Sequence, residues 1–156
     1  MNHSTEIFKN ILIPVDGSSY SLAAVRIAGR LAKIHLSKVT ILHVIDIQVE
    51  EQLCRFNKEQ CESIKINMEE EAQGLVEHMK RELSTLGLEA HTIVIRGTPH
   101  EVILDISAQE SVDLIVMGKL GRRGIKRILL GSVAERVIEF SRCPVLLVND
   151  HECKQR

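Results

Sequence analysis

The sequence predicts an α/β fold, a doubly wound parallel sheet with helices on both faces. Two observations support this prediction. Five short apolar runs, suited to strands buried on both faces, alternate along the chain with segments of helical periodicity. Capping signals also stand at the start of two of the later helical segments. The chain has 156 residues, of which 44% are hydrophobic and 26% charged, so we expect one domain spanning residues 1–156.

The apolar runs are the expected strands. In order they are Ile11–Val15, Val39–Ile45, Ile93–Ile95, Leu114–Met117 and Val145–Val148. Parallel strands joined by right-handed helical crossovers place their carboxyl ends along one edge of the sheet. Ligands of such sheets lie beyond that edge, where the strand order reverses.

The first two helical segments follow the first two strands. Ser18 or Ser19 can cap a helix whose apolar stripe is Ala24, Ile27, Ala28, Leu31 and Ile34. The second segment keeps three- and four-residue steps and ends at Gly87; its apolar positions are Ile64, Met68, Ala72, Leu75, Met79, Leu83 and Leu86. Residues 47–63 are more polar, and we expect them to extend this helix at its start.

The last two helical segments begin with sequences that resemble capping boxes. Thr98-Pro99-His100-Glu101 combines an N-cap, a proline at the first helical position and a glutamate at the third. Ser132 with Glu135 has the same spacing, which predicts Ser132 as the N-cap of the last helix.

A glycine-rich segment, GKLGRRGIKRILLGS, runs from Gly118 to Ser132 directly after the fourth strand. Its glycines stand at positions 118, 121, 124 and 131. The order strand, glycine loop, helix start predicts a phosphate cradle, because glycines expose backbone N–H groups and a helix N-terminus attracts anions. The spacing fits neither the P-loop nor the dinucleotide fingerprint.

Each candidate residue of this cradle also has a structural interpretation. Ser132 can cap its helix or contact phosphate. Asp16, at the end of the first strand, can shape a turn or accept a ribose hydroxyl. The sequence does not say which of the basic residues touch phosphate: Lys119, Arg122, Arg123, Lys126 and Arg127.

The spacing G-x2-G-x9-G-S resembles the signature of the ATP-binding branch of the universal stress protein family. Three other segments resemble that family in the same order: Ile11–Ser18, Leu42–Ile45 and Gly97–Glu101. The resemblance spans about residues 8–149, and it implies an adenine-nucleotide alpha-hydrolase-like sheet of order 3-2-1-4-5. Strands 1 and 4 are then neighbours at the reversal of strand order.

The resemblance further implies ATP as ligand, with Mg²⁺ or Mn²⁺ held through the phosphates. The nucleotide-binding residues that it implies are Pro14, Val15, Asp16, Val44, Met117, Gly118, Gly121, Gly131, Ser132 and Val133. From the residues alone, Val44 is a core position. The resemblance also implies a homodimer through the apolar edge strand Val145–Val148.

Several other functions are disfavoured by composition. A net charge of −1 and 3% aromatic residues argue against nucleic-acid binding, and no apolar run approaches the ~20 residues of a membrane span. The N-terminal sequence does not look like a signal peptide, so we expect a cytoplasmic location. No H-x3-H, C-x2-C or G-x-S-x-G pattern predicts a metal or catalytic residue. We expect reduced thiols that serve as small apolar residues, in preference to a redox switch, at Cys54, Cys61, Cys143 and Cys153.

The function expected from the sequence is a nucleotide-responsive regulator or switch with little hydrolysis. Between Gly118 and Ser132 no Asp, Glu, Gln or His is available to position an attacking water, and Glu135 is expected to bond back to its cap. An alternative is a slow ATPase or a nucleotidyl- or phosphoryl-transfer enzyme that uses the same site. A third hypothesis is a protein-interaction module whose glycine loop is only structural. The sequence specifies no protein partner.

Overall fold

The computed structural model describes residues 7–122 and 129–150. Its elements are β1 (Asn10–Pro14), α1 (Ser19–His35), β2 (Lys38–Asp46), α2 (Ile47–Phe56), η1 (Lys58–Gln60), α3 (Cys61–Ser84), β3 (Ala90–Gly97), α4 (Pro99–Gln109), β4 (Leu114–Gly118), α5 (Ser132–Phe140) and β5 (Val145–Val148). The five strands form one parallel sheet of order β3-β2-β1-β4-β5. Both the predicted fold class and the implied strand order are confirmed.

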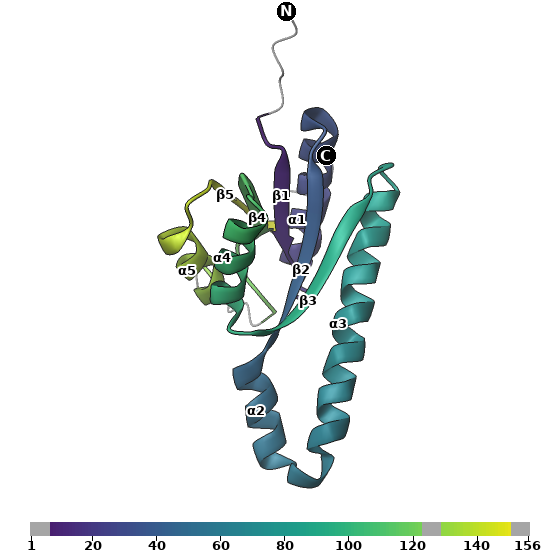
Figure 1. Ribbon diagram of the computed structural model, residues 1–156, viewed down its shortest axis with the longest axis vertical. Helices are drawn as coiled ribbons and strands as arrows, with labels where there is room; N and C mark the ends of the chain where they lie inside the picture. Colours follow the sequence, from purple (N-terminus) through teal and green to yellow (C-terminus); the bar gives the residue numbers. More distant parts are fainter. Residues whose placement is uncertain (1–6, 123–128, 151–156) are drawn as a thin grey trace, which may run out of the picture.

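Helices cover both faces of this sheet (Figure 1). Because side chains alternate along a strand, Ile11 and Ile13 of β1 pack with α1 and α3, whereas Leu12 packs with α4 and α5. Both cores are tight, and Leu12 and Ile13 have no exposed surface. The sheet is therefore buried on both sides, as its continuous apolar strands predict.

The start of α1 agrees with the sequence and its end does not. Ser18 is the N-cap, and its side chain accepts a hydrogen bond from Ser21 N. Ala24, Ala28 and Ala32 are fully buried, but Ile34 is 66% exposed, so its assignment to the apolar stripe was wrong. Ile34 lies two residues, about 200°, beyond Ala32 and thus on the opposite side of the helix.

Helix α3 ends at Ser84, three residues before the predicted stop at Gly87, so Leu86 of the predicted apolar stripe lies in the turn after the helix. Gly87 has φ +75°, a left-handed conformation that glycine adopts without strain, and Leu88 N donates to Leu83 O at 3.2 Å.

The two capping boxes are not formed. Gly131, rather than Ser132, is the N-cap of α5, so Ser132 is the first helical residue and Glu135 the fourth. This one-residue shift removes the predicted bond between Glu135 and its cap. Thr98 is the N-cap of α4 and Pro99 follows it at the first helical position, but the Thr98 side chain makes no capping hydrogen bond.

Residues 61–63 belong to α3, as expected, but residues 47–60 do not extend that helix. Asn57 leaves helical geometry, with φ −133° and ψ 61°, and the chain reverses between α2 and α3. The resulting helical hairpin brings Cys54 and Cys61 together in a disulfide, with Cα atoms 4.6 Å apart. The expectation of reduced thiols at this pair was wrong, because the reversal folds the two cysteines against each other. Cys143 is a free cysteine, and Cys153 lies outside the described residues.

Candidate functional site

A cavity of about 830 Å³ opens at the carboxyl ends of β1, β2 and β4. It lies where the strand order reverses, between β1 and β4. All ten residues that the sequence comparison with the family singled out border it: Pro14, Val15, Asp16, Val44, Met117, Gly118, Gly121, Gly131, Ser132 and Val133.

The structural reason for a glycine differs among the three described glycines of the loop. A Cβ at Gly118 would lie 2.7 Å from Tyr20 Cβ and 2.9 Å from the Tyr20 carbonyl carbon, so the start of α1 needs a glycine there. A Cβ at Gly121 would lie 2.8 Å from Asp16 Oδ2. At Gly131 the nearest atom, Lys119 O, would be 3.4 Å away, and φ −70° is open to any residue. Neither backbone conformation nor protein packing explains Gly131.

Asp16 connects the two loops that border the cavity. Its Oδ1 accepts from Ser18 N at 2.9 Å, which shapes the turn after β1, and its Oδ2 accepts from Arg122 N at 3.1 Å. The structural interpretation of Asp16 as a turn residue is therefore correct. Each carboxylate oxygen has a second lone pair, so a ribose contact is compatible with these bonds.

The first turn of α5 presents unpaired donors to the cavity. Glu135 N donates to Gly131 O at 2.9 Å, and the N-cap supplies no side-chain acceptor. The amides of Ser132, Val133 and Ala134, all cavity-lining residues, thus donate to no group in the part of the chain that the structure describes. The start of α1 differs, since Ser18 there binds Ser21 N. Three such donors at a helix N-terminus form an anion site.

The opposite side of the cavity is apolar. Val44 of β2 is partly exposed to the cavity instead of serving only as core. The apolar lining residues that the sequence reasoning missed include Val49 of α2, Met68 of α3 and Ile103 of α4. Helical periodicity could locate Met68 and Ile103 on apolar faces but not the cavity that they face.

Three titratable side chains that the sequence did not assign to the site also border the cavity: His43, Asp46 and Glu135. His43 Nδ1 lies 2.7 Å from Val15 O, and since a carbonyl only accepts, Nδ1 carries the proton. Asp46 Oδ1 caps α2 through Gln48 N. Glu135 is exposed and, within the described residues, its carboxylate makes no hydrogen bond or ion pair.

Of the basic residues, Lys119 and Arg122 border the cavity, whereas Arg123, Lys126 and Arg127 lie outside the described residues, as does Gly124. Among residues 7–122 and 129–150, no group of three or more His, Cys, Asp or Glu side chains is arranged to hold a metal ion. In the same ranges, no helix has the length and apolarity needed to cross a bilayer.

Comparison with known proteins agrees with the fold and with the loop pattern. The family model described as "Universal stress protein family" matches residues 7–149. Universal stress protein MJ0531 of Methanocaldococcus jannaschii is 36% identical over 148 residues, covering 95% of this chain and 86% of that protein. Universal stress protein MJ0577 of the same organism is 36% identical over 154 residues.

Solved structures show the same relationship. The structure of MJ0577 superposes with a TM-score of 0.81 at 36% identity and covers 92% of this chain and 96% of that one. Universal stress protein UspA from Lactobacillus plantarum gives a TM-score of 0.74 at 26% identity, covering 90% and 97%. A universal stress protein in complex with cAMP shares the fold, with a TM-score of 0.63 at 21% identity. Sequence, topology and loop geometry agree, and the chain belongs to the universal stress protein family.

Proposed function

We propose that this chain binds ATP in the 830 Å³ cavity and acts as a cytoplasmic, nucleotide-responsive regulator. The observation that carries the proposal is the pairing of two unlike ends within one cavity. One end offers the unpaired amides of the α5 N-terminus, and the other offers the apolar side chains of Val44, Val49 and Met68. A ligand that matches both ends has an anionic group and a flat apolar group.

The order of the strands supports a direction for the nucleotide. Val44 stands on β2, Asp16 follows β1, and Gly118 ends β4, so these residues lie on successive strands at about 5 Å intervals. Adenine fits against Val15, Val44 and Met117, the ribose near Asp16, and the phosphates against Gly118, Gly121 and the first turn of α5. Gly131 supports this placement, because nothing in the protein itself requires a glycine there.

Mg²⁺ or Mn²⁺ would accompany ATP through the phosphate oxygens. The donor set of the cavity fits this role, since Asp16 and Asp46 are already engaged in turn and cap hydrogen bonds. A site with few carboxylates of its own suits Mg²⁺, which retains waters and binds substrate phosphates.

Adenine-nucleotide ligands are known for this fold. Universal stress proteins have been solved with cAMP and, from Archaeoglobus fulgidus, with dAMP, at 21% and 20% identity to this chain. At such identities the likeness concerns the fold, so the support for ATP comes from the cavity described above.

The direct test is to extract the purified protein with acid and identify the released nucleotide by chromatography. The proposal is supported if adenine nucleotide copurifies with the wild-type protein and if the amount per chain is lower in the Gly131→Val variant. A protein that releases no nucleotide, and acquires none after incubation with ATP–Mg and gel filtration, contradicts it.

A slow ATPase is the second candidate, and Glu135 is the observation that favours it. This carboxylate borders the cavity one residue past the unpaired amides and is not bonded to its cap, contrary to the sequence expectation. A carboxylate free to orient water is a component that hydrolysis needs.

We predict that hydrolysis remains far below the median enzyme rate of ~10 s⁻¹, because Glu135 is exposed and no hydrogen bond from the described residues positions its carboxylate. Phosphate release from ATP–Mg, measured after a second purification column, tests this. Glu135→Gln should leave ATP affinity unchanged. Turnover near one per second that Glu135→Gln abolishes would contradict the regulator hypothesis and support the ATPase hypothesis.

A further inference from the structure

The hairpin formed by α2, η1 and the N-terminal half of α3 lies outside both cores. Figure 1 shows it extending away from the rest of the sheet and its helices. Glu50 is the one buried residue of α2, and the buried residues of α3 begin at Ala72. From residue 47 to residue 71 the chain therefore buries a single side chain, and that side chain is charged. Apolar packing alone cannot fix such a segment, so its position depends on other restraints.

One restraint is an ion-pair cluster that joins the hairpin to β3. Arg96 Nε lies 3.0 Å from Glu50 Oε2, and Arg96 Nη1 lies 2.6 Å from Glu69 Oε2. Arg96 Nη2 also donates to Lys65 O at 3.2 Å. The hydrogen bond to Glu50 raises the pKa of Arg96, with burial acting in the opposite direction. The cluster holds α2 and α3 at one point on the sheet.

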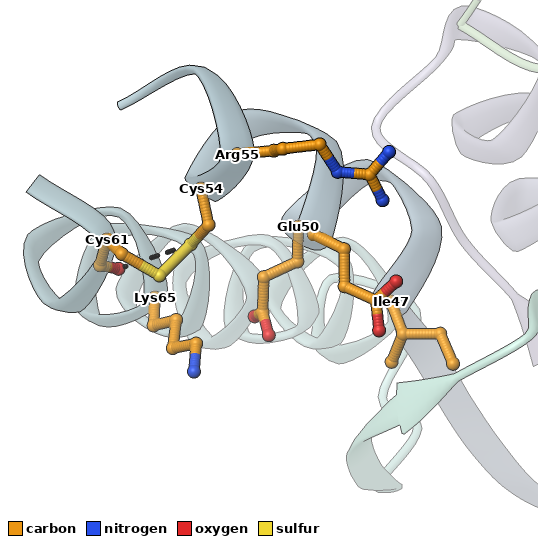
Figure 2. Close-up of a pocket in the computed structure, with 7 residues that line it drawn as sticks. Ile47, Glu50, Cys54, Arg55, Cys61 and Lys65 are labelled. Carbon is orange, nitrogen blue, oxygen red and sulfur yellow. Dashed lines mark hydrogen bonds between the residues drawn. A yellow bond between two sulfur atoms is a disulfide. The ribbon is translucent and has the colours of Figure 1, made fainter. Parts of the chain in front are cut away.

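The other restraint is the Cys54–Cys61 disulfide at the far end of the hairpin. Both cysteines border a surface pocket of about 410 Å³, so a small thiol can reach the sulfur atoms (Figure 2). Cys61 is the first residue of the 24-residue helix α3, and the N-cap residue, Gln60, offers no side-chain acceptor. Cys61 thus lies at a helix N-terminus, with Lys65 one turn further on.

The hairpin also forms part of the nucleotide cavity. Asp46 and Val49, where α2 begins, border that cavity, as does Met68 of α3. Val49 directly precedes Glu50, and Met68 directly precedes Glu69. Glu50 and Glu69 are the two carboxylates that pair with Arg96. Cys54 lies one turn beyond Glu50 on α2. The disulfide, the Arg96 cluster and the cavity wall therefore follow one another along the same two helices.

We propose that Cys54 and Cys61 form a reversible thiol–disulfide exchange site, and that its oxidation state sets the affinity of the cavity for nucleotide. The second half of this inference rests on the proposed function. Its co-reactant is a dithiol reductant.

A thiolate of the reductant attacks Cys54 Sγ, and the S–S electron pair leaves with Cys61 as thiolate. The second thiol of the reductant then displaces Cys54, and the reductant departs as a disulfide. The protein gains two electrons and two protons.

Reduction weakens nucleotide binding. With the disulfide closed, α2 and α3 are fixed at both ends of the hairpin. Val49 and Met68 are then held in place at the cavity wall. With the disulfide open, the Arg96 cluster is the remaining restraint described above, and the binding-competent arrangement is a smaller fraction of the population. The apparent affinity falls by that fraction.

The experiment uses the full chain with Cys143→Ser and Cys153→Ser, which leaves one cysteine pair. The protein is equilibrated in buffers of defined reduced-to-oxidised dithiothreitol ratio, and its free thiols are alkylated and counted by mass spectrometry. Hydrogen exchange of residues 47–71 and the affinity for ATP–Mg, by calorimetric titration, are then measured for the fully oxidised and the fully reduced protein.

We expect a reversible two-electron transition, faster exchange in the hairpin on reduction, and ATP binding that is weaker by about fivefold or more. Cys54→Ser with Cys61→Ser should show the reduced-state affinity in both buffers. The proposed redox site would be contradicted by a disulfide that opens only on global unfolding. It would also be contradicted by equal hydrogen-exchange rates of residues 47–71 in the oxidised and reduced proteins. Equal ATP affinities would overturn the coupling. Absence of ATP binding in both redox states would contradict the proposed function. In that case, thiol counting and hydrogen exchange still test whether Cys54 and Cys61 form a reversible redox site.

Discussion

Neither backbone conformation nor packing within the protein requires a glycine at position 131. Its φ of −70° suits any amino acid, and a Cβ would make ordinary contacts, the nearest at 3.4 Å from Lys119 O. Its amide donates to that same oxygen at 3.0 Å, which holds the start of α5 against the loop after β4. A side chain larger than one carbon would extend beside the unpaired amides, in the space that we assign to phosphate.

We predict that Gly131→Val lowers ATP affinity at least tenfold while changing the free energy of unfolding by less than about 1 kcal/mol. The valine enters the space that we assign to ligand, and its Cβ meets no protein atom closer than 3.4 Å. Gly74→Val is the matched control, because nothing lies within 4 Å of a Cβ there and position 74 is on α3, away from the cavity lining. Calorimetry gives the affinity and urea unfolding the stability. If Gly131→Val binds ATP normally, the phosphates lie elsewhere.

At the scale of elements, α1 and β4 meet through Gly118. The start of α1 approaches the end of β4 so closely that a Cβ at Gly118 would lie 2.9 Å from the backbone of Tyr20. The same contact sets the position of the loop after β4, and Asp16 fastens that loop at Arg122 N. The packing of two elements thus fixes the wall of the cavity.

We predict that Gly118→Ala destabilises the fold by about 1–3 kcal/mol, because the methyl group meets backbone atoms that cannot move independently. Urea unfolding measures the loss. The contrast with Gly131→Ala is informative, since that change should cost less than about 0.5 kcal/mol. Equal stabilities for the two alanine variants would contradict the packing that we describe.

Local sequence patterns predicted most elements and missed contacts between elements. Strands and their order followed from apolar runs and the family resemblance, and Gly87 marked the turn after α3. Periodicity could not show that the chain turns back at Asn57, because polar residues on both sides fit an exposed helix. The Cys54–Cys61 pairing depends on that turn. The capping box at Ser132 failed for a related reason, since Gly131 N is already engaged by Lys119 O and the helix starts one residue earlier than predicted.

At the scale of the whole molecule, β5 is an edge strand of the sheet that the described residues form. Strand Val145–Val148 pairs with β4 on one side, and Leu146 is 37% exposed. Nearby on α5, Ile138 and Phe140 are 44% and 54% exposed. An apolar edge strand favours pairing with a second copy about a two-fold axis. We propose that this chain forms such a homodimer.

Leu146→Lys should convert the dimer into a monomer, because a like charge would face its own copy across the two-fold axis. Leu53→Lys, on the exposed hairpin with 42% exposure, is the control and should leave the mass unchanged. Light scattering at concentrations on the order of tens of micromolar measures the mass of each. A wild-type protein that is monomeric under those conditions argues against the dimer.

The central claim is that one cavity binds ATP through the α5 N-terminus and an apolar wall. Calorimetric titration of the full chain with ATP–Mg, paired with a thermal melt of the same samples, tests it most directly. We predict saturable binding with one nucleotide per chain and a melting temperature that rises with ATP concentration by ligand linkage. No heat and no thermal shift at millimolar ATP would contradict the claim.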